Sequence, residues 1–299
     1  MFHRSTLYRS TSGLSRRSFV ARTAAFLPVA KAAFARNPLS ASNLGVQLYT
    51  VRKVIEQDPA TILKAIQDIG FTEVEVVYAT LEKIWPALKE TNLKPISVHV
   101  DTDIFMEGGG KLDDAIANVK KHGFKYVVVP YIAPAQRGGA ETFKHLADVL
   151  NKSGEKAKAA GLTLCYHNHA FEYEPLSGTT GLDILMRGTQ KDLVSLELDI
   201  FWASVAGHDP VSVLKKYPGR VALLHLKDKA SGVPVQFNET VPPAAFKEIG
   251  NGTIDIPAVL VTAKKSSVQH YFVEQDQTPG DPIDSLRQSF KYLSSHFTA

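Results

Sequence analysis

From about residue 40 onward, short apolar runs alternate with longer amphipathic segments. The short runs are rich in β-branched residues and are bounded by polar, Gly or Pro residues, which is typical of buried strands. We expect eight strands, at Leu44–Tyr49, Thr72–Val77, Pro95–Val100, Tyr126–Val129, Leu162–His167, Leu193–Leu198, Val221–Leu226 and His270–Val273.

The segments between these runs have the apolar spacing of helices. They cover Pro59–Ile69, Leu81–Glu90, Leu112–His122, Ala140–Ala160, Gly181–Gly188, Pro210–Tyr217, Pro257–Ser266 and Asp281–His296. Eight alternating βα units predict an α/β fold, a single-domain (β/α)8 TIM barrel over residues 37–299. A doubly wound sheet is the alternative, but Gly108-Gly109-Gly110 does not fit the phosphate-binding turn that it needs.

The connection between Leu226 and Pro257 is about thirty residues long, which exceeds the usual length of a barrel loop. It contains Pro, Gly and Asn throughout, including Gly250-Asn251-Gly252. We interpret it as a cover over the barrel mouth; a disordered insertion is the alternative.

Residues 1–36 contain seven Lys or Arg and no acidic residue, and they include the pair Arg16-Arg17. A mildly apolar run, Phe19–Ala35, follows the pair and ends in Ala33-Phe34-Ala35. This pattern predicts a twin-arginine signal peptide over residues 1–36 and a periplasmic or exported protein. An organellar transit peptide is the alternative. The run is too short and too charged to be a stable membrane anchor.

Charge and cysteine content exclude some partners and cross-links. The formal charge of the whole chain is +4. Without the predicted signal it falls to about −3, so we expect no nucleic-acid partner. Cys165 is the only cysteine, which excludes an intramolecular disulfide.

Candidate chemistry lies at the carboxyl ends of the predicted strands, where barrel enzymes place their active sites. Acidic, imidazole and amine groups gather there: Glu75, His99, Asp101, His167, His169, Glu172, Glu197, Asp199, His225, Lys227, Glu274 and Asp276. Imidazole and carboxylate together suit one divalent ion such as Mn, Co, Fe or Zn. The best-placed ligands are His167, Asp199, His225 and Glu274.

A histidine taken alone is more often a hydrogen-bonded packing residue than a metal ligand. An ionised Asp199 within an apolar run is costly unless it is paired or metal-bound. His167 and His169 share one face of their strand and Asn168 points away, so both imidazoles could be ligands, or one could act as a base. The acidic groups beside the predicted ligands could orient them or lie on a solvated face: Glu172, Glu197 and Asp276.

Several motifs together resemble one family. They are Gly45–Arg52, Tyr166-His167-Asn168-His169, Leu198–Trp202, Leu224–Asp228, Gly250–Asp255 and Val273–Asp276. From about Leu44 to Leu293 the chain is similar to the sugar phosphate isomerase/epimerase family. These are xylose isomerase-like TIM barrels, a superfamily that also includes AP endonuclease family 2.

The resemblance implies a divalent metal held by Glu, Asp, His and Glu from the last four strands. Asp199, His225 and Glu274 match three of these ligands, whereas His167 stands where epimerase-type members have Glu. Epimerases of this kind often use two carboxylates on opposite faces of the substrate. Loss of one favours one-sided proton abstraction, as in dehydration or β-elimination of a keto-sugar.

We therefore expect a metal-dependent isomerase or epimerase that removes a proton beside a carbonyl of a small carbohydrate. A keto-sugar or 3-keto-glycoside lyase is the alternative, and a non-catalytic periplasmic sugar-binding barrel is an alternative of another class. Candidate bases are Glu274, His169, His99 and Glu75, and Lys227 could neutralise oxyanion charge. Candidate substrate contacts are Trp202, Phe201, Tyr49 and Gln47, although the aromatic residues could equally pack in the core.

Overall fold

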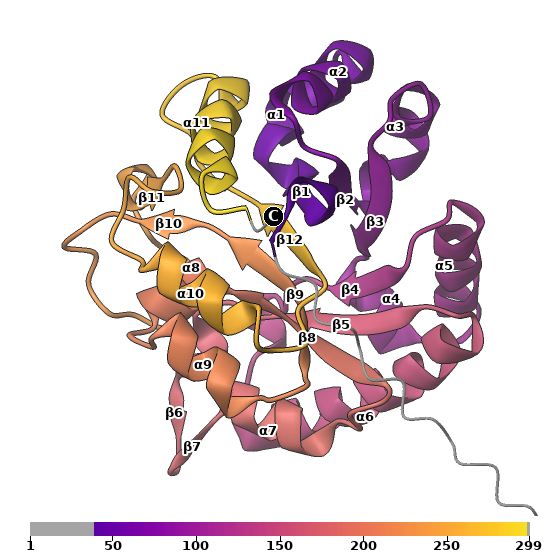
Figure 1. Ribbon diagram of the computed structural model, residues 1–299. Helices are drawn as coiled ribbons and strands as arrows, with labels where there is room; N and C mark the ends of the chain where they lie inside the picture. The colour runs from indigo at the N-terminus through magenta and orange to yellow at the C-terminus, as the bar shows by residue number, and fades with distance from the viewer. Residues whose placement is uncertain (1–38, 298–299) are drawn as a thin grey trace, which may run out of the picture. The chain divides into compact units, whose positions relative to one another are not determined.

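The computed structural model describes residues 39–297, in which eight parallel strands form a closed barrel (Figure 1). Around the barrel the order is β1-β12-β9-β8-β5-β4-β3-β2. The strands are β1 (Leu44–Gln47), β2 (Glu73–Val77), β3 (Lys94–His99), β4 (Tyr126–Val129), β5 (Thr163–His167), β8 (Val194–Asp199), β9 (Val221–Leu226) and β12 (His270–Val273). The predicted TIM barrel is confirmed. The predicted signal, residues 1–36, lies outside the described residues.

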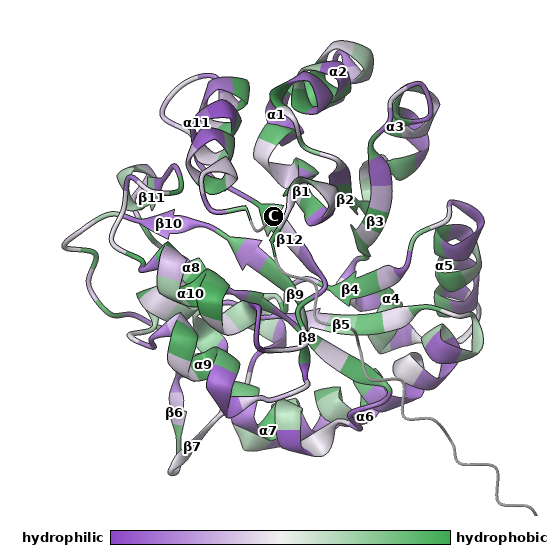
Figure 2. Cartoon of the chain, viewed as in Figure 1, coloured by the Kyte–Doolittle hydropathy of each residue, from purple (hydrophilic) through white to green (hydrophobic). Residues whose placement is uncertain are grey.

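Helices surround the barrel and carry hydrophobic and hydrophilic positions side by side (Figures 1 and 2). The predicted helices appear as α2 (Pro59–Ile69), α3 (Leu81–Leu88), α5 (Gly109–Lys121), α6 (Ala140–Ala159), α7 (Gly181–Gly188), α9 (Pro210–Lys216), α10 (Ile256–Ala263) and α11 (Pro282–Ser294). Within residues 39–297, none of the helices combines the length and apolar content that crossing a membrane requires.

Short elements that the periodicity did not predict follow several strands. They are α1 (Arg52–Ile55), α4 (Thr102–Glu107), α8 (Ile200–Val205) and the hairpins β6 (Pro175–Leu176) with β7 (Thr179–Thr180) and β10 (Asp228–Lys229) with β11 (Phe246–Lys247). Elements of two to six residues are too short to show a helical or strand period.

The two-residue period of the strands places an apolar layer below a polar one. A small buried cluster contains Cys165, Leu223 and Phe272. Two residues after each of these come His167, His225 and Glu274. Residues two apart on a strand share a face, so the polar groups lie directly above an apolar plug at the carboxyl end of the barrel.

The long segment after β9 is ordered by one buried carboxylate. Asp228 is 1% exposed and accepts backbone N–H groups from Gly250, Gly252 and Ile254 at 3.0, 2.9 and 3.1 Å. Gly250 has φ +93°, a conformation that favours glycine, and a Cβ at Gly252 would collide with the Asp228 carboxylate. The disordered-insertion alternative is therefore wrong.

Replacing this carboxylate should destabilise the protein and loosen the segment. We expect Asp228→Ala to lower the free energy of unfolding by about 2–4 kcal/mol, because several buried N–H groups lose a charged acceptor. Asp228→Asn, which keeps one acceptor oxygen, should lose less. Urea denaturation measures the stability, and limited proteolysis within residues 230–245 measures the loosening. An alanine variant with parental stability and cleavage would contradict this anchoring role.

Candidate active site

The carboxyl ends of the strands open into a pocket of about 570 Å³. The predicted site residues that line it are Tyr49, His99, His167, His169, Trp202, Lys227 and Glu274. The other predicted site residues are fully buried and lie outside the lining: Gln47, Glu75, Asp199, Phe201 and His225. The strand-end rule therefore identified the end of the barrel at which the pocket opens, but the predicted residues lie at two depths.

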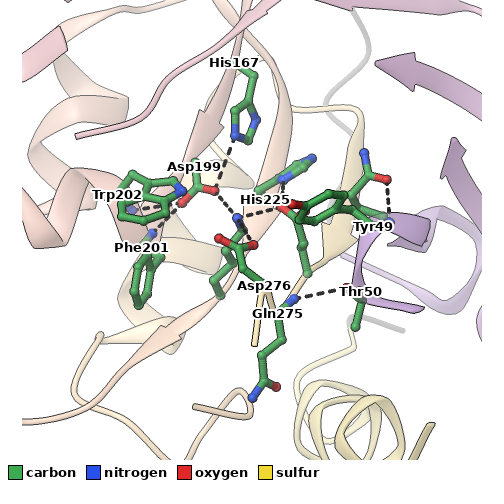
Figure 3. A network of polar contacts seen from close by, with 12 residues as sticks. Tyr49, Thr50, His167, Asp199, Phe201, Trp202, His225, Gln275 and Asp276 are labelled. Carbon is green, nitrogen blue, oxygen red and sulfur yellow. Dashed lines mark hydrogen bonds and ion pairs between the residues drawn. The ribbon is translucent and has the colours of Figure 1, made fainter. Parts of the chain in front are cut away.

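Asp199 is oriented by its own helix and by a neighbouring turn. It caps α8, where its Oδ1 accepts N–H groups from Phe201 and Trp202 at 2.8 and 3.0 Å. Its backbone N–H donates to Asn168 Oδ1 at 3.0 Å. Figure 3 shows the carboxylate with His167, His225 and Trp202 arranged around it. Because Oδ1 is occupied by the cap, Oδ2 is the oxygen that is available to a cation.

Three of the four predicted metal ligands converge. Donor atoms of Asp199, His225 and Glu274 all lie within 4.8 Å of one another, and all three residues are buried. Two carboxylate oxygens and an imidazole nitrogen at this spacing suit a divalent ion of intermediate softness. The donor set therefore fits the metal that the sequence predicts. His167 borders this group, with Nε2 3.6 Å from Asp199 Oδ2.

The two ring nitrogens of His225 face different carboxylates. Nδ1 lies 2.9 Å from Glu274 Oε2, and Nε2 lies 2.6 Å from Glu75 Oε2. Burial would lower the pKa of His225, but Glu197 and Glu75 raise it well above its usual value. A carboxylate that accepts from one imidazole nitrogen orients the other toward a metal. Glu75 has this position relative to His225, with Gln47 donating to the same carboxylate oxygen at 2.8 Å.

Lys227 lies among three carboxylates. Its Nζ is 2.9 Å from Asp199 Oδ2, 2.6 Å from Glu274 Oε2 and 2.9 Å from Asp276 Oδ1. Burial would lower the pKa of Lys227, but Asp199, Asp276 and Glu274 raise it well above its usual value. The ammonium therefore balances charge on two of the candidate metal ligands.

A second polar cluster adjoins the first. Glu197 Oε2 lies 2.8 Å from His99 Nε2 and 3.0 Å from His167 Nδ1. Burial would lower the pKa of His99, but the carboxylates of Glu75 and Glu197 raise it to about 9. Burial and the neighbouring His225 lower the pKa of His167 well below its usual value. At neutral pH, His99 is therefore a proton donor and His167 is neutral.

His169 and Trp202 both line the pocket, and each has one ring nitrogen without a hydrogen-bond partner in the described part of the chain. His169 Nδ1 and Trp202 Nε1 are buried and have no hydrogen-bond partner among residues 39–297. Their rings stack at 5.4 Å. Burial and then Lys227 lower the pKa of His169 well below its usual value, which keeps the imidazole neutral. Glu172 accepts the His169 backbone N–H at 2.8 Å and so orients this turn.

Three predicted roles need correction: substrate contact for Gln47 and Phe201, and base for Glu75. Gln47 and Glu75 are fully buried, outside the pocket lining and bonded to each other, so they support His225 from behind. Phe201 is also fully buried, and it stacks on Phe246 at 4.4 Å. The solvated-face alternative does not hold for Glu172 and Glu197, which are fully buried. Asp276 does not lie on a solvated face either, because its carboxylate forms an ion pair with Lys227.

Sequence reasoning missed several lining residues. Tyr131 lies two residues after the end of β4, where the strand-end rule would have found it. Glu239, Val241, Pro243 and Phe246 come from the long segment after β9, which therefore covers part of the mouth. No spacing in the sequence indicates which residues of so long a connection reach the pocket.

Comparison with known proteins assigns the family. Residues 63–296 match the family described as the xylose isomerase-like TIM barrel. An inosose dehydratase from Clostridium perfringens is 33% identical over 163 residues, which are 51% of this chain and 54% of that protein. The chain thus spans about half the length of the curated relatives it matches.

Solved structures share the fold. A sugar phosphate isomerase/epimerase from Parabacteroides distasonis has a TM-score of 0.72 at 21% identity, covering 88% of this chain and 98% of that one. The IOLI protein with a bound zinc atom has a TM-score of 0.66 at 18% identity, covering 86% and 99%. The chain belongs to the xylose isomerase-like TIM barrel family.

Proposed function

We propose that this protein is a divalent-metal-dependent enzyme that removes a proton beside a carbonyl group of a carbohydrate. The observation that carries the proposal is the convergence of Asp199, His225 and Glu274 beside a pocket that Glu274 itself lines. The sugar isomerase and dehydratase names of similar proteins support the same class.

Asp199, His225 and Glu274 would hold the ion, with His167 as a fourth candidate. When bound, a divalent ion supplies Lewis acidity that polarises a carbonyl and makes the neighbouring C–H group more acidic. The residues of the chain prepare the site for this. Glu75 fixes the orientation of His225, the α8 cap fixes Asp199, and Lys227 offers a cation beside the position where oxyanion charge would develop.

His169 is the base that the geometry favours. It lines the pocket, and its Nδ1 has no hydrogen-bond partner among the described residues. Glu274 is engaged by His225 and Lys227, and His99 by Glu75 and Glu197. Glu75 does not line the pocket. A neutral imidazole within reach of the substrate can accept the proton.

A lyase or dehydratase outcome is the second candidate, and the placement of the acids favours it over epimerisation. Glu274 belongs to the proposed metal group, and Asp276 pairs with Lys227 beside it; both residues follow the same strand, β12. His167 and His169 come from the end of β5 instead. Two opposed carboxylates are therefore replaced by a carboxylate and an imidazole, which suits removal of a proton without its return to the other face.

We further propose a non-phosphorylated substrate. Among the described residues, one arginine and one lysine line the pocket: Arg52 and Lys227. Arg52 donates to the carbonyl oxygens of Tyr49 and Asp276 at 2.9 and 2.7 Å, and Lys227 is held by carboxylates. Neither is free to hold a phosphate. The proposed export of the protein agrees with a free or glycosidic sugar.

Proton exchange tests the function directly. Incubation of the metal-loaded protein with aldoses, ketoses and 3-keto-glycosides in deuterium oxide should put deuterium beside the carbonyl of one of them. Chelation should abolish the exchange, and added metal should restore it. His225→Ala should lose both exchange and the bound ion, expected at about one per chain. Mass spectrometry and metal analysis measure the two effects; binding without exchange would favour a sugar-binding barrel.

Removing the competing ammonium should strengthen metal binding. In Lys227→Met, Asp199 and Glu274 lose a cation within 3 Å, so we expect divalent-metal affinity to rise about tenfold or more. Isothermal titration of the metal alone measures this, independently of activity. Lys229→Met, two residues further along the chain, is the matched control and should bind as the parent does. Weaker binding in Lys227→Met would show that the ammonium does not compete for this site.

Trp202→Phe tests the unused indole donor. The substitution removes Nε1–H and keeps an aromatic ring. The keto-sugar that shows deuterium exchange with the parent protein should therefore bind about five- to tenfold more weakly. Trp85→Phe, on α3 and outside the pocket lining, is the control. Calorimetric titration gives both dissociation constants. Equal affinity in the parent and Trp202→Phe would mean that the indole N–H does not contact the sugar.

A further inference from the structure

The pocket has two unlike halves. Its floor consists of ionisable side chains that are almost fully buried, such as His167, Lys227 and Glu274. Another part of the lining is apolar: Pro130, Tyr131, Val241, Pro243 and Phe246. We refer to these five residues as the wall. At the mouth, Tyr49 is 42% exposed, and the Arg52 guanidinium lies 4.0 Å from its ring centroid. Glu239, which lies two residues before Val241, is a carboxylate in the same part of the lining, and its charge is balanced by an ion pair with Arg137.

The apolar wall is held in place from two sides. Glu239 forms an ion pair with Arg137 through the two terminal guanidinium nitrogens, at 3.1 and 3.0 Å. Arg137 Cζ lies 3.6 Å from the centroid of the Phe171 ring. At the other end, Phe246 stacks on Phe201 of α8. The wall is thus a preformed surface, and binding against it does not require ordering of the segment.

A bare sugar ring would use only the floor. Its hydroxyl groups need hydrogen-bond partners when they leave water, and the wall side chains Val241, Pro243 and Phe246 offer none. The cavity of about 570 Å³ falls within the range of pockets that enclose drug-sized ligands. Volume and lining together indicate a substrate with a second, apolar part.

We infer that the substrate is a glycoside whose sugar lies on the polar floor and whose apolar or aromatic aglycone packs against the wall. This inference rests on the proposed function, because the floor is taken as the place of proton abstraction. Trp202 and His169 mark the boundary between the halves: they stack on each other, and Trp202 also lies 6.0 Å from Phe246. In this arrangement the wall supplies the contact area that the floor does not.

The test compares two probes that differ only in the aglycone, methyl and phenyl 3-keto-β-glucoside, on the full-length, metal-loaded protein. Isothermal titration should give about tenfold or more tighter binding of the phenyl glycoside. Val241→Asp should bring this ratio close to one, and Val241→Ser should lower it by less. Val235→Asp is the matched control: it lies on the same segment, is 64% exposed and is outside the pocket lining, so the ratio should stay parental.

Equal affinity for the two glycosides, or binding of neither, would overturn the inference. A phenyl preference that Val241→Asp leaves unchanged would also overturn it, because the wall would not be the contact. Proton exchange on the methyl glycoside is measured in parallel. Absence of exchange with an intact phenyl preference would count against the proposed function and leave the aglycone site standing.

Discussion

The need to balance buried carboxylates governs the carboxyl end of this barrel. An ionised carboxylate removed from water costs several kcal/mol unless a cation or hydrogen-bond donors replace its hydration. Each acidic group here has such a partner: His225 lies between Glu75 and Glu274, and Lys227 lies between Asp199 and Glu274. Removing one cationic partner would leave its neighbours uncompensated. The polar layer is therefore one connected unit, and its members cannot be exchanged independently.

The strand period explains why this layer was largely predictable. On a barrel strand, alternate residues face the interior, so an apolar residue followed two positions later by an ionisable one marks the step from plug to site. Cys165 and His167 form such a pair, as do Leu223 and His225. The same short apolar runs predicted all eight strands, because burial on both faces leaves an almost continuous hydrophobic sequence.

Depth within the barrel was not predictable, because it depends on pairing between strands. Gln47 is aligned with Glu75 in the neighbouring strand, and the register of β2 against β3 shifts between Val74 and Glu75. No single strand contains this information. Gln47 therefore looked like a substrate contact and Glu75 like a base, although both lie behind His225. The Arg137–Glu239 pair joins residues 102 positions apart and was hidden for the same reason.

Lys227 also bears on how the protein can exist with and without a metal. Its ammonium already compensates Asp199 and Glu274, so the folded barrel does not need a divalent ion to offset their charge. This separates the site from structural zinc sites, in which the metal supplies the folding energy. With Asp199 and Glu274 as the proposed ligands, a divalent ion would compete with the ammonium, which would retain Asp276 as a partner. On this proposal, the free energy of metal binding is reduced by the free energy of the displaced Lys227 ion pairs, and those same ion pairs stabilise the site without a metal.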